Sequence, residues 1–239
     1  MTSRGAAKKQ EAAEPVGNAD GGAQPLALMI ADKIEEDIVL GRRHPRERLI
    51  EQELSAYFGT HRGDVRLALF ELEKRGIVQR IPNRGAIVRD LTPQEVREIY
   101  GVREELEVMA IRILPLPVAP AALDNLVALQ QQHSRAVDAC DLVAVFYTNL
   151  HFHRALFSLC GNACLIETID QLAQKVRVIR SSANADAAVL DRARRDHAKM
   201  IEALRRFERD DLIALTRRHL KAAPEAYARA YRLRFGEAA

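Results

Sequence analysis

Residues 45–89 read PRERLIEQELSAYFGTHRGDVRLALFELEKRGIVQRIPNRGAIVR. In this stretch Leu54 and Phe58 form the apolar face of a short helix, and Gly59 stands where that helix would end. A second helix opens at Thr60, after a turn of only a few residues. Two short helices joined this closely are typical of a helix-turn-helix.

The second helix of the pair is amphipathic and is followed by a hairpin. Val65, Leu69 and Leu72 recur at helical spacing, and Gly76 stops the pattern. Residues 77–89 contain two short β-branched runs on either side of the turn Pro-Asn-Arg-Gly, which predicts a β-hairpin. A helix-turn-helix followed by a hairpin predicts a winged helix-turn-helix.

The chain on both sides of this segment is helical in pattern. Ile30, Ile34 and Ile38 lie on one face of an upstream helix. Downstream there is no alternating segment, and we expect helices near 93–113, 120–138, 141–160, 164–181, 187–208 and 211–235. Pro224 should break or kink the last of these helices. The sequence therefore predicts a mainly α protein. A winged helix-turn-helix at 25–91 precedes an all-α bundle of six or seven helices at 92–239.

Composition excludes several classes of protein. The chain has 239 residues and a net charge of +3, with 48% apolar residues. Residues 1–24 lack an apolar period and are expected to be a disordered tail. No apolar run is long enough for a membrane span or a signal peptide, and three cysteines do not make a disulfide framework. We therefore expect a cytoplasmic protein with no membrane partner.

Basic side chains concentrate on the two elements that would meet DNA. Arg62 and Arg66 lie one turn apart on the second helix of the pair, and Arg84 lies at the hairpin tip. Residues 60–89 hold seven basic and three acidic side chains, a local charge of +4 that exceeds that of the whole chain. Because a guanidinium can bond a guanine edge or a phosphate, this placement favours double-stranded DNA as the partner.

Residues 25–91 resemble the winged helix of the GntR family of bacterial regulators. The resemblance rests on PRERL at 45–49, ELS at 53–55, GIV at 76–78 and PNRGAIV at 82–88. It implies DNA contacts from Arg62, Arg66, Arg84 and Gly85. His61 and Gln52 stand where the family commonly has Ser and Arg, so the operator sequence is expected to differ. A homodimer on a palindromic operator is the implied assembly.

A second constellation is a set of polar side chains in the helical part. Asn149 and His153 are spaced to share one helix face, and His197 and His219 lie on two later helices. Three helices of a bundle could bring these four side chains together around a divalent metal, because imidazole is a good ligand for Zn, Ni, Cu or Fe. The alternative is that each histidine is an ordinary structural residue.

A rival zinc site would use neighbouring histidines and cysteines. Its members would be His151, His153, Cys160 and Cys164. Residues 151 and 153 project from nearly opposite faces of a helix, and the two cysteines straddle an expected helix end. We therefore expect the thiols to serve as packing side chains.

Residues 95–222 are similar to the FCD domain, the ligand-binding domain of the FadR subfamily, and look closest to the VanR branch. The matching stretches are REELE at 103–107, FHRAL at 152–156, DHAKM at 196–200 and HL at 219–220. The resemblance implies a divalent metal, Zn or Ni, held by an Asp and three His. Those positions are Asn149, His153, His197 and His219 here, so the amide replaces a charged ligand.

The same resemblance assigns a role to Arg103. It matches an arginine that points into the pocket, where it would bind the carboxylate of a small effector. The alternative is an ion pair with Glu107 on the same helix. Together these features predict a transcription regulator, a repressor controlled by a small organic acid. The competing hypothesis is a metal-dependent enzyme of the helical-bundle type.

Overall fold

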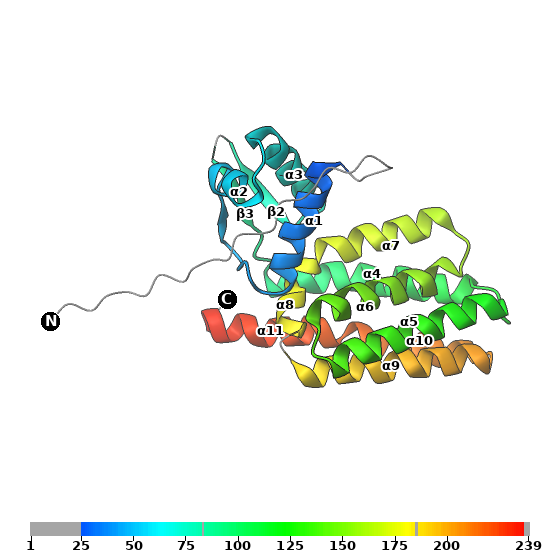
Figure 1. Cartoon of the computed structure of the whole chain (residues 1–239). Helices are drawn as coiled ribbons and strands as arrows, with labels where there is room; N and C mark the ends of the chain where they lie inside the picture. Colours follow the sequence, from blue (N-terminus) through cyan, green and yellow to red (C-terminus); the bar gives the residue numbers. More distant parts are fainter. Residues whose placement is uncertain (1–24, 83, 185, 237–239) are drawn as a thin grey trace.

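The computed structural model describes residues 25–82, 84–184 and 186–236. The expected tail at 1–24 lies outside the described residues. Over the described range the chain forms a small winged helix seated on one end of a longer helical bundle (Figure 1). In this range no helix is long and apolar enough to cross a membrane.

The winged part contains three helices and a three-stranded sheet. In chain order its elements are α1 (Leu26–Val39), β1 (Arg48–Leu49), α2 (Glu51–Phe58), α3 (Arg62–Lys74), β2 (Val78–Ile81) and β3 (Gly85–Val88). The expected hairpin is β2–β3, with Arg80 opposite Ala86. Strand β1 adds to the other edge of β3 with Leu49 opposite Ala86, so the sheet order is β1-β3-β2.

The rest of the described chain is helical, which confirms the expected mainly α fold class. Its elements are α4 (Pro93–Ile113), α5 (Pro120–Asp138), α6 (Leu142–Ser158), α7 (Ala163–Lys175), the 3₁₀ turn η1 (Arg177–Ile179), α8 (Arg180–Asn184), α9 (Ala187–Arg205), α10 (Arg209–Leu220) and α11 (Ala222–Phe235). Thr92 caps α4 by accepting a hydrogen bond from the Glu95 amide at 3.1 Å.

One of the expected helices is interrupted: the helix expected at 164–181 is α7, η1 and α8. The helix expected at 211–235 is divided into α10 and α11 just before Pro224, which confirms the expected break. Within the interruption between α7 and α8, Val178 and Ile179 are buried in the core below the winged helix. Burial of these β-branched side chains outweighs the weak preference of the segment for one continuous helix.

One apolar core joins the winged part to the bundle. It contains Ile34 of α1, Leu69 of α3, Ile179 of η1 and Tyr227 of α11. The Tyr227 hydroxyl donates to the Leu91 carbonyl at 2.5 Å, so α11 also binds the segment that connects the two parts. The winged helix is therefore packed on the bundle and is not tethered by a free linker.

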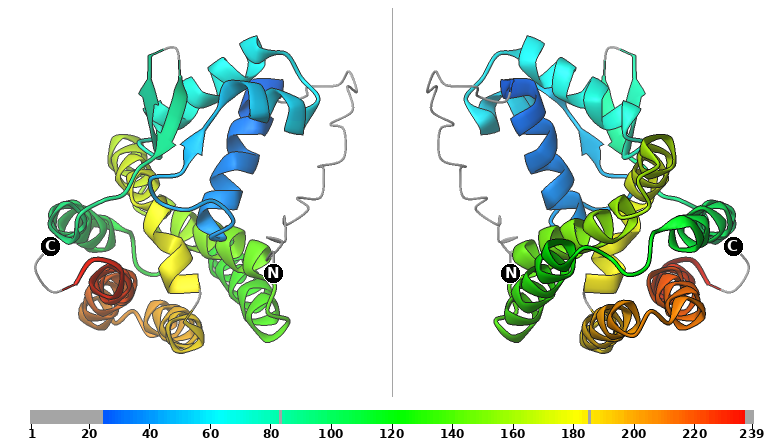
Figure 2. Two further views of the ribbon diagram at one scale, coloured as in Figure 1. Left: turned by 90° about the vertical axis from the view of Figure 1, so that its left-hand side faces the viewer. Right: turned by 90° about the vertical axis from the view of Figure 1, so that its right-hand side faces the viewer.

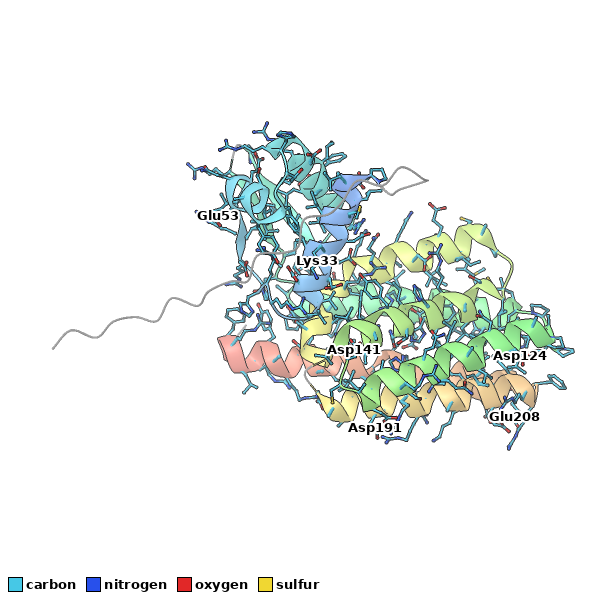
Figure 3. All side chains as sticks on the ribbon, in the orientation of Figure 1. Lys33, Glu53, Asp124, Asp141, Asp191 and Glu208 are labelled. Atoms are coloured by element: carbon cyan, nitrogen blue, oxygen red, sulfur yellow. The ribbon has the colours of Figure 1, made fainter. Side chains whose placement is uncertain are left out.

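A second core fills the bundle between α4, α5, α6, α7, α9 and α10. Ile111, Phe152 and Met200 are fully or almost fully buried there. The end-on views show the bundle helices around this centre (Figure 2). Charged side chains such as Asp124, Asp191 and Glu208 lie on its outside (Figure 3).

Candidate DNA interface and metal centre

Helix α3 is the second helix of the helix-turn-helix and is called the reading helix below; its residues Arg62 and Arg66 are exposed. Arg62 is the first residue of α3 and His61 is its N-cap, and both are exposed. Arg66 follows one turn later and is also exposed, with its Nε donating to Glu51 Oε2 of α2 at 2.8 Å. The side chain of Gln52 is exposed on α2. These four side chains lie on the two elements that form the helix-turn-helix.

At the wing, Arg84 is exposed but Gly85 is buried. Gly85 has a φ of +92°, a conformation that side-chain-bearing residues rarely adopt. A Cβ added to Gly85 would lie 2.1 Å from the Leu49 carbonyl oxygen of β1. The glycine is therefore required by the close approach of β1 to β3, whether or not it also contacts DNA.

The structure brings three of the four proposed metal ligands together. His153 of α6, His197 of α9 and His219 of α10 have ligand atoms within 4.8 Å of one another. The Nε2 atom of His153 lies 3.2 Å from Nε2 of His197 and 3.0 Å from Nε2 of His219. Three helices that are distant in sequence thus direct one ring nitrogen each toward a common point.

A hydrogen bond behind the ring orients His197. Gln130 donates its amide to the Arg194 carbonyl at 2.9 Å, so its Oε1 faces His197 Nδ1 at 3.0 Å and accepts a hydrogen bond from it. The proton on Nδ1 leaves the Nε2 lone pair of His197 free to bind a metal. Asp196 Oδ2 lies behind His219, 3.6 Å from its Nδ1, which is too far for a hydrogen bond.

The electrostatics keep two of the three rings neutral. Burial, followed by the charges of neighbouring groups, lowers the pKa of His153 and of His197 well below the usual 6.5. Neutral imidazoles whose lone pairs converge at about 3 Å cannot all hydrogen-bond to one another. A divalent cation would satisfy them, so the residues present fit a metal.

Asn149 is buried on α6, one turn before His153, and both side chains line the same cavity. Its amide oxygen can be a ligand but carries no charge. Arg103 of α4 also lines this cavity, under Tyr100 and hydrogen-bonded to Glu107 Oε1 at 2.7 Å. Arg103 therefore pairs with Glu107 and also lines the cavity.

The rival zinc site does not form in the described residues. His151 and Cys164 are exposed, and neither belongs to a group of side chains close enough to share a metal ion.

The sequence did not predict two residues near this site, His133 beside the histidine cluster and Arg180 in the lining of the cavity. His133 of α5 is buried and donates from Nδ1 to the Thr148 hydroxyl at 3.1 Å, while burial lowers its pKa to about 4. No motif marks either residue, because the cluster forms only in the folded bundle.

Two family models match the chain. Residues 26–88 match the family described as bacterial regulatory proteins, gntR family, and residues 98–222 match the FCD domain. The chain belongs to the GntR family of bacterial transcription regulators. This regulator therefore carries a DNA-binding winged helix and an FCD domain. Because the family consists of transcription regulators, the enzyme hypothesis is not supported.

Relatives of this GntR regulator share its length and fold. It is 24% identical over 203 residues to the transcriptional repressor RspR of Escherichia coli, covering 85% of this chain and 89% of that one. It is 27% identical to a probable D-xylose utilization operon repressor of Paenarthrobacter nicotinovorans, covering 75% and 78%. The structure of E. coli McbR has the same fold, with a TM-score of 0.76 at 20% identity, covering 87% and all of the respective chains.

Proposed function

We propose that this GntR regulator is a repressor that binds a palindromic operator as a homodimer and releases it when a small organic acid enters the FCD cavity. The repressor role is supported by the names of two relatives. Two copies of α3 would enter successive major grooves, with Arg62 and Arg66 contacting bases or phosphates. Arg84 would contact the backbone at the wing.

The proposed effector site is supported by the cavity between α4, α6 and α7. His153, Asn149 and Arg103 line it together. We propose that Asn149, His153, His197 and His219 hold a divalent ion, Zn or Ni. The ion would supply a Lewis-acidic position for an effector carboxylate. Arg103 is positioned to bind the same carboxylate through its planar guanidinium.

A short ionic route supports control of DNA binding from this cavity. Arg177 of η1 lines the cavity and donates to Glu35 of α1. Glu35 also accepts from Arg75, the C-cap of α3, at 2.7 Å. An effector that changes the position of Arg177 would therefore act on the helix that reads DNA. Such control requires unequal effector affinity for the two states of the regulator.

The two sites can be tested against each other with variants of the full-length protein. Arg62→Ala should weaken operator binding at least about tenfold while bound zinc per chain stays unchanged. His153→Ala should lose zinc and the response to acids but keep operator binding in their absence. Metal content and fluorescence anisotropy with labelled DNA measure both. Operator binding that survives Arg62→Ala together with Arg66→Ala would contradict the DNA-binding assignment.

A further inference from the structure

The cavity of the FCD domain is lined by more cations than anions. Arg103, Arg154, Arg177 and Arg180 face it. Three of them have carboxylate partners. Arg103 pairs with Glu107 at 2.7 Å and Arg154 with Asp170 at 3.6 Å, and Arg177 donates to Glu35.

Arg180 is the exception. It opens α8 just after the break in the helix, and no carboxylate or other acceptor among the described residues bonds to its guanidinium. Burial, with Arg103 and Arg177 nearby, lowers the pKa of Arg180 against the opposing effects of Tyr100 and Glu107, although an arginine stays protonated at neutral pH. A partly buried cation that lines a cavity and forms no ion pair is only weakly compensated, and such a cation favours an anionic ligand.

The proposed metal ligands add no negative charge. The amide of Asn149 carries no charge, and the imidazoles of His153, His197 and His219 carry no negative charge in either protonation state. Asp196, behind His219, is already matched by Arg218 at 2.6 Å. A divalent ion held there would keep its two positive charges. With Arg180 the cavity would hold three uncompensated positive charges, of which a monocarboxylate would neutralise only one.

We infer that the effector carries two anionic groups, one directed at the histidine cluster and the other bound by Arg180. Such an effector would be a short dicarboxylic acid or another small acid with two negative charges. This inference rests on the proposed effector function of the cavity and narrows it to a ligand class. Arg180 is then the residue that distinguishes a diacid from a monoacid.

The cavity has to open for such a ligand. The free volume between its side chains is about 40 Å³, which is less than a diacid occupies. Arg154 is the side chain best placed to move, because it is 67% exposed and forms the longest ion pair of the lining. Entry of the diacid would therefore displace side chains, whereas Arg180 would remain to receive the second anionic group.

The test uses pairs of acids that differ only in the second carboxylate. Zinc-loaded full-length protein is titrated calorimetrically with glutarate against pentanoate and with succinate against butyrate. We expect the diacid of at least one pair to bind at least about tenfold more tightly. Arg180→Gln should abolish this preference and leave monoacid affinity within about threefold, whereas Arg180→Lys should retain part of it.

A stability measurement separates binding from a structural role. Because Arg180→Gln removes an unpaired charge, the ligand-free variant should unfold at the same temperature as the parent or a few degrees higher. Arg135→Gln, on the exposed side of α5, is the control and should leave the acid preference unchanged.

Three results would count against the inference. Equal affinity of the parent for both acids of each pair contradicts the second anionic group but leaves the effector site intact. A lower unfolding temperature for Arg180→Gln, with equal losses for all acids, assigns Arg180 a structural role. If no acid binds and none changes operator affinity, the proposed effector function itself fails and this inference with it.

Discussion

Arg66 is held by a single exposed ion pair in the DNA-free regulator. Its partner Glu51 lies on α2, and the two side chains approach to 2.8 Å. Because the Arg66 side chain is 65% exposed, solvent screens this pair and its strength is low. Under the proposed DNA contact of Arg66, the Glu51 carboxylate would compete with a DNA phosphate or base for the guanidinium.

Removing the competing carboxylate should therefore strengthen DNA binding. We expect Glu51→Gln to raise operator affinity by up to about fivefold, the limit set by an exposed ion pair of about 1 kcal/mol. Anisotropy titrations at two salt concentrations measure this gain in operator affinity, which should be smaller at high salt. Glu53→Gln is the matched control on α2, where Glu53 lies on the outer side (Figure 3). An equal gain in both variants, or a loss in Glu51→Gln, would contradict this competition.

At the scale of elements, the wing depends on the two-residue strand β1. Gly85 begins β3 directly against the Leu49 carbonyl of β1, at a φ of +92°. The position of Arg84 follows from this contact, because Arg84 immediately precedes Gly85. A side chain at residue 85 would push β1 and β3 apart and shift the tip of the wing.

We therefore expect Gly85→Ala to cost about 1–3 kcal/mol from the backbone conformation alone, and more from the contact with Leu49. Operator affinity should fall with it. Gly101→Ala provides a control of opposite sign. Gly101 lies inside α4 with nothing near the added Cβ, so alanine should stabilise by up to about 1 kcal/mol. Urea unfolding measures both changes, and a Gly85→Ala protein as stable as the parent would rule out the β1 explanation.

At the scale of the whole molecule, the winged helix and the FCD domain share a core and a buried ion network. Glu35 is 3% exposed and lies between Arg75 of the winged part and Arg177 of the bundle. Arg75 also bonds Asp32 at 2.6 Å. The network spans the contact seen between α1 and the bundle in Figure 1. Loss of the Glu35 carboxylate would remove a negative charge beside the guanidinium groups of Arg75 and Arg177.

Glu35→Gln should therefore destabilise the protein by about 3–5 kcal/mol, the cost of breaking a buried pair from one side. It should also reduce the change in operator affinity that a saturating acid produces. Glu36→Gln removes a neighbouring carboxylate whose Lys33 partner is 41% exposed, and it should cost less than about 1 kcal/mol. Comparable costs for the two variants, with the acid response intact, would show that the network does not couple the sites.

Local signals in the sequence were sufficient for the winged helix-turn-helix and for most helix positions. The spacing of Val65, Leu69 and Leu72 and the turn around Arg84 act over a few residues, so they can be recognised without knowing the fold. The capping box of Thr92 and Glu95 is local in the same way. Strand β1 is only two residues long, and nothing in its own sequence identifies it.

The candidate site depended on more than local pattern. Spacing pairs Asn149 with His153, the expected helices bring in His197 and His219 as possible partners, and the resemblance to the FCD domain supports the same four residues. The convergence of the three histidines within 4.8 Å is a property of three packed helices. Gln130, which orients His197, could not be chosen from the sequence because it is distant from His197 in the chain and lies in none of the motifs.

The amino-acid sequence by itself determined the order of elements, the two arginines of the reading helix and the uncharged amide at position 149. Only the tertiary structure decided which charges in the cavity are compensated. The helix expected through residue 181 breaks at Val176 because Val178 and Ile179 are buried below the winged helix. That break places Arg177 against Glu35 and leaves Arg180 without a partner among the described residues. Ion pairing depends on distances between remote segments, and packing sets those distances.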